Sequence, residues 1–389
     1  MLTAEIIFWS CLGAVLHSYL LYPLLLRLLV SGKAANRQVY AQNDEFPLVS
    51  ILIAAHNEES VIGDKLESIF ASDYPLEKIE VLVGSDNSTD RTNAIIEEFQ
   101  RKHETVRLIA FTSRRGKVRI INHLSEQAAG GVFVITDANV IFDRDTLRQL
   151  VRHFKNPAIA LVDTNMVNKG MKKEGISVQE KTYIESEVFT KNAEGRIWGS
   201  MMGPFGGCYA VRKSHFSKVP ENFLVDDFYI NMKVLERGGL CINEINARVY
   251  EDVSNSLVEE FRRKVRIATG SFQNLFAFSH LLFRFNGVSF SFFSHKVLRW
   301  FGPMFMLGGV AAIIPLMQAY DLYRYLFLAG LILLLLPLFD LLLRQVNTHV
   351  ALLRFATHFF SMNLALLAGF FKFVSGVKSS VWEPTRRNQ

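Results

Sequence analysis

Asp137-Ala138-Asn139 combines the residue types of a metal and phosphate site, and it follows the largely apolar run Gly131 to Thr136. A run that is short and rich in β-branched and aromatic residues predicts a buried strand. In open α/β sheets, ligands bind at the carboxyl ends of the strands. A carboxylate there can hold a divalent cation against a diphosphate, because hard cations take oxygen ligands. Since an isolated Asp-x-Asn is more often a turn or a helix cap, the interpretation depends on the neighbouring motifs.

Two earlier apolar runs also end in polar residues. His56-Asn57-Glu58-Glu59 follows the first run, and Asn57 could cap a helix whose positive end the two glutamates favour. Ser85-Asp86-Asn87-Ser88-Thr89-Asp90 follows the second run and is typical of a turn with an N-cap. The turn and the N-cap do not require Asp86, so its carboxylate could accept a hydrogen bond from the imide N–H of a uracil-type base.

Three later motifs supply charged side chains, or glycines that let a ligand approach the backbone closely. Arg115-Gly116-Lys117 precedes a helical stretch and could bind a phosphate, although a solvated basic face explains it equally well. The glycine-rich run Gly203 to Arg212 is either a plain hairpin or a loop that an acceptor can approach. Asp226-Asp227 precedes the helical stretch Tyr229 to Arg237. One of these acids is a good N-cap, and the other is free to act as a general base whose pKa its neighbour would raise.

The segments around these motifs alternate between apolar runs and helical spacing. The runs are Leu48 to Ala55, Ile79 to Gly84, Val106 to Phe111 and the strand that opens at Val132. Such alternation predicts a parallel sheet covered by helices. No Gly-x-Gly-x-x-Gly follows the first run, so a dinucleotide-binding Rossmann domain is disfavoured. The three cysteines are scattered and indicate neither a disulfide framework nor a zinc site.

The two ends of the chain are apolar enough to enter a membrane. Ile6 to Leu26 contains no formally charged residue and is long enough to cross a bilayer as a helix. A cleaved signal peptide is disfavoured, because the run lacks a basic start and a small-residue cleavage site. Trp300 to Tyr320 is the strongest later span, whereas Tyr325 to Phe339 and Phe355 to Phe371 are shorter and could instead lie in the interface.

The net charge of +6 comes partly from basic residues that flank these apolar ends. Such flanks favour the cytoplasmic side of a membrane and anionic headgroups. Apolar residues from Val258 to Leu275 recur at helical spacing with basic residues between them, which predicts an amphipathic interfacial helix. The sequence contains no nucleic-acid-binding motif, so nucleic acid is excluded as a partner.

Taken together, these motifs resemble the membrane-bound enzymes of glycosyltransferase family 2, which include the hyaluronan, cellulose and poly-N-acetylglucosamine synthases. The resemblance covers about residues 48–300 and implies an α/β fold of the GT-A type, a nucleotide-diphospho-sugar transferase domain, with interfacial helices and flanking transmembrane helices. The motifs occur in the family's order: Ala55-His56-Asn57-Glu58, Asp86-Asn87-Ser88-Thr89-Asp90, Gly116-Lys117, Asp137-Ala138-Asn139, Gly206-Gly207, Asp226-Asp227 and Arg263-Lys264-Val265-Arg266.

The resemblance implies a role for each motif. Asp227 would be the catalytic base that deprotonates the acceptor hydroxyl, with Asp226 beside it. Mg²⁺ or Mn²⁺ would be held by Asp137 and Asn139. The donor, a UDP-sugar, would be bound by Ala55, Asn57, Glu58, Asp86, Lys117, Asp137 and Arg266. The acceptor would be bound by Gly206, Gly207 and Arg263. The expected chemistry is a single displacement that inverts the anomeric carbon, in which the metal neutralises charge on the departing UDP.

Two departures from the family pattern weaken specific parts of this expectation. Asn139 stands where many members have a second Asp, although an Asn carbonyl can still bind a cation. The family's Gln-x-x-Arg-Trp signature falls at Arg263-Lys264-Val265-Arg266-Ile267, so only its arginine is kept, as Arg266. The missing Trp normally stacks on the acceptor sugar, and its loss argues against processive synthesis of a long polymer.

The implied function is transfer of a sugar to a growing glycan or a lipid-linked acceptor in bacterial surface-polysaccharide synthesis. Transfer of one sugar to a membrane lipid, as in ceramide-type glucosyltransferases, is the alternative that the missing Trp favours. A non-catalytic nucleotide-sugar sensor or partner subunit is an alternative of another class. The joint presence of Asp86, Asp137, Asp227 and Arg266 argues against it.

The expected organisation has five parts, and the sequence gives no indication of the oligomeric state. The parts are an N-terminal transmembrane helix (1–32), a cytoplasmic GT-A domain at the bacterial inner membrane (46–256), amphipathic interface helices (257–299), two or three transmembrane segments (300–376) and a basic tail (377–389). Three late spans would place the C-terminus outside, whereas Lys378, Arg386 and Arg387 favour the cytoplasm. One late segment could therefore be re-entrant or interfacial.

Overall fold

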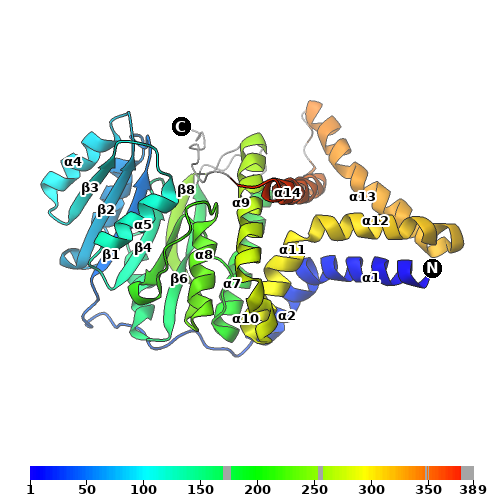
Figure 1. The fold of residues 1–389 in the computed structure, drawn as a ribbon, viewed down its shortest axis with the longest axis horizontal. Coiled ribbons are helices and arrows are strands. Elements are labelled where there is room, and N and C mark those ends of the chain that lie inside the picture. Colours follow the sequence, from blue (N-terminus) through cyan, green and yellow to red (C-terminus); the bar gives the residue numbers. More distant parts are fainter. Residues whose placement is uncertain (170–176, 253–256, 347, 349, 378–389) are drawn as a thin grey trace.

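A mixed β-sheet forms the centre of the soluble part of the molecule (Figure 1). The computed structural model describes residues 1–169, 177–252, 257–346, 348 and 350–377. Within these residues, eight strands pair in the order β3-β2-β1-β4-β7-β6-β8-β5. Their bounds are β1 Val49–Ala55, β2 Ile79–Asp86, β3 Val106–Phe111, β4 Val132–Asp137, β5 Ile141–Phe142, β6 Ile159–Lys169, β7 Cys208–Arg212 and β8 Leu240–Asp252.

The predicted parallel sheet is present in the first half of the domain. Strands β1 to β4 run parallel, and the register places Ala54 of β1 beside Asp137 of β4 and Ala55 beside Ser85 of β2. The polar residues after these strands therefore meet at one edge of the sheet. The prediction gave no direction for β7, which runs antiparallel to both β4 and β6. A five-residue strand that is buried on both faces has the same apolar pattern in either direction.

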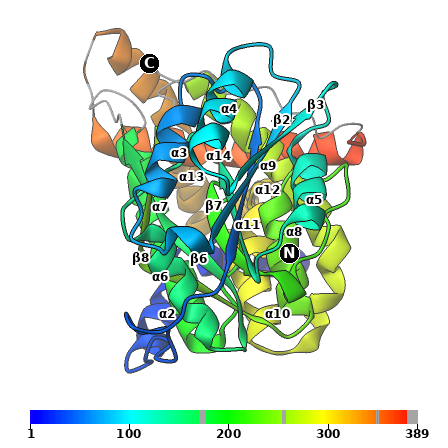
Figure 2. The ribbon, with the colours of Figure 1, turned by 90° about the vertical axis from the view of Figure 1, so that its left-hand side faces the viewer.

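Helices cover both faces of the sheet, because alternate residues of each strand face opposite sides. Ile51 and Ile53 of β1 pack with α3 (Ile62–Phe70), α4 (Thr92–Lys102) and α6 (Thr146–Val151). Leu52 of the same strand packs with α5 (Lys117–Gln127), α8 (Asp226–Glu236) and α9 (Leu257–Phe278). The long helix α7 (Ser177–Trp198) completes the domain on the side that adjoins the membrane helices (Figure 2).

Two helix starts differ from the sequence-based interpretation. Asn57 does not cap a helix, since α3 begins at Ile62 and Asn57 adopts a left-handed conformation with φ of 54°. Neither Asp226 nor Asp227 is an N-cap, because both lie in the first turn of α8, after Val225. In that turn their charges still interact favourably with the positive end of the helix.

The membrane part of the molecule consists of long apolar helices. Among the described residues, four helices are long and apolar enough to cross a membrane: Leu2–Val30, Gly302–Ala319, Asp321–Gln345 and Ala351–Val374. The first comprises α1 (Leu2–Leu16), the short π-helix His17–Leu21 and α2 (Tyr22–Val30), and the others are α12, α13 and α14. These helices make the chain a membrane protein, as the sequence predicted. The stretch between α9 and α12 includes the short helices α10 (Gly287–Ser291) and α11 (Leu298–Trp300).

The four long helices are not packed as one bundle. In Figure 1, α1 and α12 lie side by side and project away from the sheet, and α13 returns obliquely. Close contact between α1 and α12 is possible because Gly308 faces Cys11, where even a Cβ atom would lie 3.2 Å from the Cys11 Sγ. Helix α14 instead lies crosswise to this pair and packs on α9 of the soluble domain (Figures 1 and 2).

Helix α14 is expected to tolerate no side chain at Gly369. A Cβ atom there would lie 2.4 Å from the Ala268 Cβ and 2.9 Å from the Thr269 backbone nitrogen of α9. Gly369→Ala should therefore lower the free energy of unfolding by about 1–3 kcal/mol, the usual cost of overpacking. Gly330→Ala in α13 is the control, since a Cβ there meets nothing within 4 Å. Thermal unfolding in detergent should separate the two variants, and equal stability would contradict this packing.

Candidate active site

A cavity of about 680 Å³ extends from the carboxyl ends of β1 and β4 to the membrane helices. Most of the residues predicted to form the site line it, and these are Glu58, Lys117, Asp137, Asn139, Gly206, Gly207, Asp226, Asp227, Arg263 and Arg266. Ala55, Asn57 and Asp86 are not among the lining residues. The fold therefore brings ten sequence-predicted residues to one cavity and leaves three beside it.

Lys117 links the carboxylates at the centre of the cavity. Its Nζ donates to the Asp137 Oδ1 at 2.6 Å and lies 4.0 Å from the Asp226 Oδ2. Burial opposes the charge of Lys117, but Asp137 and Asp226 outweigh it and raise the pKa of the ammonium. Lys117 is the first residue of α5, and the turn before it requires Gly116, whose φ is 86°. The lysine is thus a permanent cation held between two acids.

Asp227 has the altered acidity expected of a base. Burial, followed by the neighbouring charge of Asp226, raises its pKa to about 7. The loop before β7 approaches its carboxylate so closely that a Cβ atom at Gly206 would lie 2.8 Å from the Asp227 Oδ2. A group with this pKa can accept a proton from an acceptor hydroxyl near neutral pH.

Asp86 is fully buried and organises the loop that leads to Lys117. Its carboxylate accepts hydrogen bonds from the backbone nitrogens of Arg115 at 2.6 Å and Gly116 at 3.0 Å, and from the Arg114 Nε at 3.1 Å. These donors already use both carboxylate oxygens. The structure therefore gives Asp86 a positioning role, while its predicted contact with a uracil base stays a prediction.

Asn57 and Glu58 connect the loops after β1 and β2. The Asn57 Oδ1 accepts a hydrogen bond from the Thr89 backbone nitrogen at 2.8 Å, and the Glu58 backbone nitrogen donates to the Thr92 Oγ1 at 2.8 Å. Only Glu58 of the two residues reaches the cavity wall. Ala55 is fully buried as the last residue of β1.

Asn139 meets an acid that the sequence analysis missed. The Asn139 Nδ2 donates to the Glu251 Oε1 at 3.2 Å, and both Glu251 and its neighbour Asp252 line the cavity. The signal for them was the polar end of the strand Leu240–Asp252. Within the described residues, no three acidic, histidine or cysteine side chains gather as a metal site. Protein oxygens at Asp137 and Asn139 therefore fit a cation that shares most of its ligands with a bound diphosphate.

Arg266 and Arg263 enter the cavity from α9. The Arg266 Nη1 donates to the carbonyl oxygen of Leu224 at 3.3 Å, which ties α9 to the segment before Asp226. Burial and the nearby Arg263 lower the pKa of the Arg266 guanidinium, which is nonetheless far too basic to lose its charge at neutral pH. The arginine kept from the family signature thus lies in the same cavity as Asp137 and Asp227.

Two buried lysines at the cavity were not recognised in the sequence: Lys191 in its wall and Lys65 behind Asp137. The Lys65 Nζ donates to the Thr136 Oγ1 at 3.0 Å and the Val140 carbonyl oxygen at 2.5 Å, on both sides of Asp137. Lys191 pairs with Asp163 at 2.5 Å, and the Asp163 Oδ1 accepts the Phe205 backbone N–H at 3.1 Å. Because lysine side chains are almost always solvated, the sequence alone predicts exposed positions for both of them.

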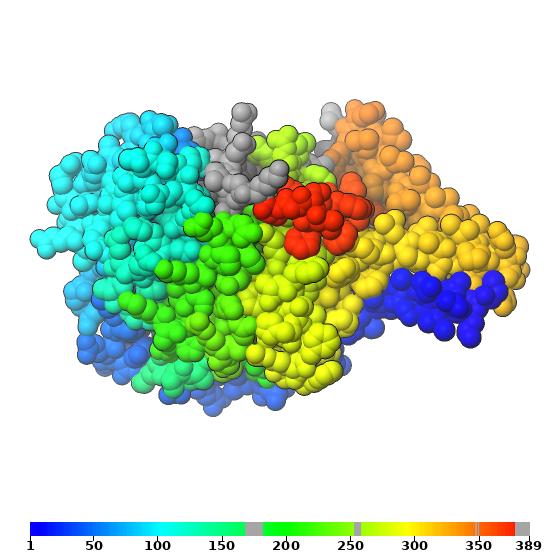
Figure 3. Space-filling model, viewed as in Figure 1, coloured from blue at the N-terminus to red at the C-terminus, as the bar shows by residue number. Residues whose placement is uncertain are grey.

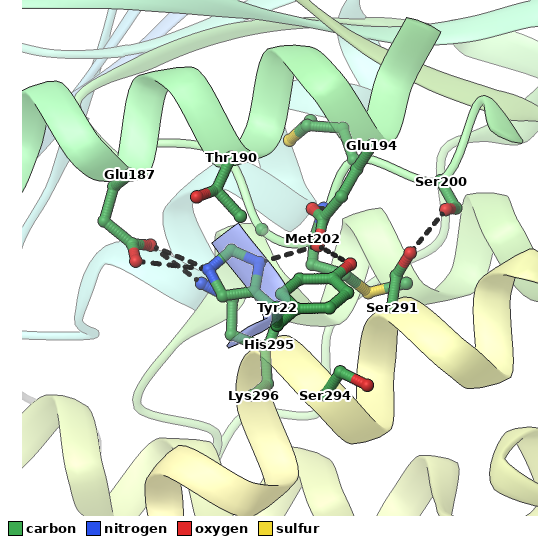
Figure 4. Close-up of polar contacts among 12 residues, drawn as sticks. Tyr22, Glu187, Thr190, Glu194, Ser200, Met202, Ser291, Ser294, His295 and Lys296 are labelled. Carbon is green, nitrogen blue, oxygen red and sulfur yellow. Dashed lines mark hydrogen bonds and ion pairs between the residues drawn. The ribbon is translucent and has the colours of Figure 1, made fainter. Parts of the chain in front are cut away.

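The membrane end of the cavity is held by a buried ionic network (Figure 4). Both ring nitrogens of His295 face carboxylates, that of Glu194 at 2.9 Å and that of Glu187 at 3.1 Å. Glu194 also accepts the hydroxyl of Tyr22 at 2.8 Å, so the network joins the N-terminal membrane helix to α7. Burial opposes the charge of Glu187, but Arg299 and Lys296 outweigh it and hold the pKa of the carboxyl well below its usual range.

The fold places the chain in the GT-A class. A solved mannosyltransferase from Pyrobaculum calidifontis, in complex with GDP-Man and Mn²⁺, matches it with a TM-score of 0.71 at 22% identity. The match covers 95% of this chain and 97% of that chain. This similarity confirms the predicted GT-A fold with its membrane helices.

The sequence comparisons match the sheet half of the domain. Residues 50–219 match the model for glycosyl transferase family 2, the family that the motifs resemble. It is 26% identical over 163 residues to β-monoglucosyldiacylglycerol synthase of Synechocystis, covering 40% of this chain and 34% of that protein. It is 30% identical over 128 residues to poly-β-1,6-N-acetyl-D-glucosamine synthase of Staphylococcus epidermidis. That match covers 33% of this chain and 30% of that protein. The chain thus spans about a third of the length of these relatives.

We expect Gly206→Ala to impair the chemistry more than the fold. The added methyl group would displace the Asp227 carboxylate, which lies 2.8 Å from the Cβ position and can move. Transfer, measured as release of nucleoside diphosphate, should fall at least about tenfold, because small misplacements of reacting groups cost this much or more. Gly131→Ala is the control, since its Cβ meets nothing within 4 Å. Equal activity of the two variants would contradict the contact.

Proposed function

We propose that the protein is an inverting membrane glycosyltransferase that transfers a sugar from a nucleotide-diphospho-sugar to a membrane-associated glycan or lipid-linked acceptor. The observation that carries the proposal is the shared cavity. Acids that suit a metal-diphosphate site and a base line one end, and residues of the membrane helices line the other. An acceptor that is anchored in the membrane can reach Asp227 through such a cavity. The activities named for the relatives, which act on a lipid and on a polysaccharide, agree with it.

Asp227 is proposed to remove the proton of the acceptor hydroxyl while that oxygen attacks the anomeric carbon. The bond from the anomeric carbon to the diphosphate oxygen breaks as the new glycosidic bond forms. Lys117 and Arg266 line the cavity and carry the positive charge that the departing diphosphate requires. A single displacement of this kind inverts the configuration at the anomeric carbon.

Asp137 and Asn139 are proposed to hold Mg²⁺ or Mn²⁺. When bound, the cation neutralises the charge of the leaving diphosphate. Lys117 donates to the Asp137 Oδ1, so the second carboxylate oxygen of Asp137 and the Asn139 carbonyl are the proposed protein ligands. This limited set agrees with a cation that binds together with the nucleotide, as in the Mn²⁺ complex of the structural neighbour.

Transfer of a single sugar to a membrane lipid is the second candidate function. It is favoured by Ile267, which stands where the family's acceptor-stacking Trp is expected and lines the cavity. The donor need not carry uracil as its nucleobase. The residue expected to bind uracil, Asp86, already accepts hydrogen bonds from the protein backbone. A cytoplasmic catalytic domain at a bacterial inner membrane remains part of the proposal.

A donor screen tests the proposed function directly. UDP-glucose, UDP-N-acetylglucosamine, UDP-galactose, UDP-glucuronate and GDP-mannose would be incubated with the purified protein, membrane lipids and Mn²⁺. One donor should give release of nucleoside diphosphate and a glycosylated lipid or glycan. A ladder of products supports polymer synthesis, whereas a single glycolipid supports the second candidate. No release from any donor would favour a sensor or partner subunit.

The pH profile should identify Asp227 as the base. Because the base must be ionised, kcat/KM should rise with pH through a midpoint near 7, the pKa of Asp227. Asp227→Asn should lose about 10²–10⁴-fold in kcat, the range for removal of a general base, and still bind the nucleotide. Asp226→Asn should move the midpoint to lower pH, since the Asp226 charge raises the pKa of Asp227. A profile unchanged in Asp226→Asn would refute this coupling.

The role of Asp137 is tested by binding rather than by turnover. Asp137→Ala should abolish the gain in nucleoside-diphosphate affinity that Mn²⁺ gives the wild-type protein, measured by titration calorimetry. Asp252→Asn is a matched control, because it also removes an acid from the cavity wall. If Asp137→Ala keeps the full effect of Mn²⁺, the metal binds elsewhere.

A further inference from the structure

Helix α14 has the length and composition of a membrane span, but its contacts are those of a surface helix. We propose that α14 does not cross the bilayer and instead lies on its surface on the side of the catalytic domain. Its outward face would rest on lipid acyl chains, and its inward face forms a wall of the active-site cavity. The proposal concerns the position of the helix and holds whether or not the proposed reaction is correct.

The contacts at the two ends of α14 carry the inference. Near its start, the ring of His358 lies 6.5 Å from that of Tyr183 in α7. Near its end, the ring of Phe373 lies 5.1 Å from that of Phe276 in α9. Both partners belong to helices of the soluble domain. A helix that crossed the bilayer could touch this domain with one end only, because its other end would lie about 30 Å away on the opposite surface.

The composition of α9 excludes a partner that crosses the bilayer alongside it. Helix α9 contacts α14 closely at Gly369, and the same helix carries Glu260, Arg263, Lys264 and Arg266. A span packed along α9 would draw these charges into hydrocarbon, at a cost of roughly 2.5–3.5 kcal/mol for each central arginine or lysine. On the membrane surface the same packing leaves the charges in the protein cavity or in water.

The two faces of α14 differ as a surface helix requires. The inward face lines the cavity at helical spacing with Phe355, His358, Phe359, Met362, Asn363 and Leu366. The outward face exposes Leu364 by 59% and Phe371 by 60%. The polar residues in the middle of the helix, His358 and Asn363, therefore face protein, and the exposed apolar residues are free to contact lipid.

The view of the whole molecule agrees with this position. In Figure 3 the red helix α14 lies across the junction between the soluble domain and the projecting membrane helices. It is crosswise to α1 and α12, whose shared axis marks the direction of crossing (Figures 1 and 2). With α14 on the surface, the chain crosses the bilayer three times, through Leu2–Val30, α12 and α13. The end of α14 then lies on the catalytic side, which removes the conflict between the predicted topology and the basic tail.

Cysteine labelling in sealed proteoliposomes tests the side on which α14 ends. The parent carries Cys11→Ala, and the buried Cys208 and Cys241 are kept. Ser375→Cys, just after α14, is compared with Lys102→Cys on the soluble domain and Tyr320→Cys in the turn between α12 and α13. We expect an impermeant maleimide to label Ser375→Cys from the same side as Lys102→Cys. Labelling from the side of Tyr320→Cys would overturn the proposal.

Depth measurements provide a second test that does not depend on reaction with maleimide. Nitroxide labels would be placed at Leu352→Cys, Leu364→Cys and Val374→Cys, which are exposed positions near the start, the middle and the end of the helix. Leu352 and Val374 are about 33 Å apart along the helix, at 1.5 Å per residue. We expect all three labels to report the same shallow depth from the catalytic side. A maximum of depth at Leu364 with the two outer labels at opposite surfaces would show a span and refute the proposal. Because neither test uses a sugar donor, failure here is distinct from failure of the proposed reaction.

Discussion

The balance of charge around Lys117 is the interaction on which the rest of the site depends. Asp137, Asp226 and Asp227 share one cavity, and three ionised acids so close together would repel each other strongly. Lys117 neutralises part of this charge by contact with Asp137 and Asp226. Burial and the remaining repulsion raise the pKa of Asp227 to about 7. Lys117 thus neutralises part of the charge of Asp137 and Asp226 and leaves Asp227 as a group that can exchange a proton near neutral pH.

The balance of charge around Lys117 depends on the positions of the loops that surround the cavity. Buried charged side chains fix these positions. Asp86 binds the backbone that leads to Lys117, and Lys65 binds the strand end on both sides of Asp137. The pair of Lys191 and Asp163 holds the backbone at Phe205, one residue before Gly206. Removing one partner of such a buried pair leaves an uncompensated charge, which is costly. The domain therefore uses its buried polar groups mainly to set the backbone near the reacting atoms.

Sequence alone predicted the first four strands and most of the cavity, because strand ends and acidic motifs are local features. Asp137 and Lys117 each follow or precede a recognisable element, so their meeting follows from a parallel arrangement. Asp227 instead enters the cavity from α8, after the antiparallel strand β7. The direction of β7 was not predictable, since a short strand buried on both faces carries no directional signal. Glu251 and His295 were missed because their partners, Asn139 and Glu187, are more than one hundred residues away. The positioning role of Asp86 could not be predicted from the sequence either, since the groups that donate hydrogen bonds to it are backbone nitrogens of a distant loop.

Helix α9 connects the chemistry to the membrane. One side of it presents Arg266 to the cavity that holds Asp137 and Asp227, and another side packs on α14 at Gly369. Leu224 accepts a hydrogen bond from Arg266, so the segment that leads into the first turn of α8 is attached to the same helix. Any force that lifts α14 from α9 would therefore disturb the arginine and the base together. In the proposed surface position of α14, its contact with lipid would hold Arg266 and Asp227 at a fixed depth relative to the bilayer. In the proposed reaction, the headgroup of a membrane-anchored acceptor would then reach Asp227 without leaving the surface.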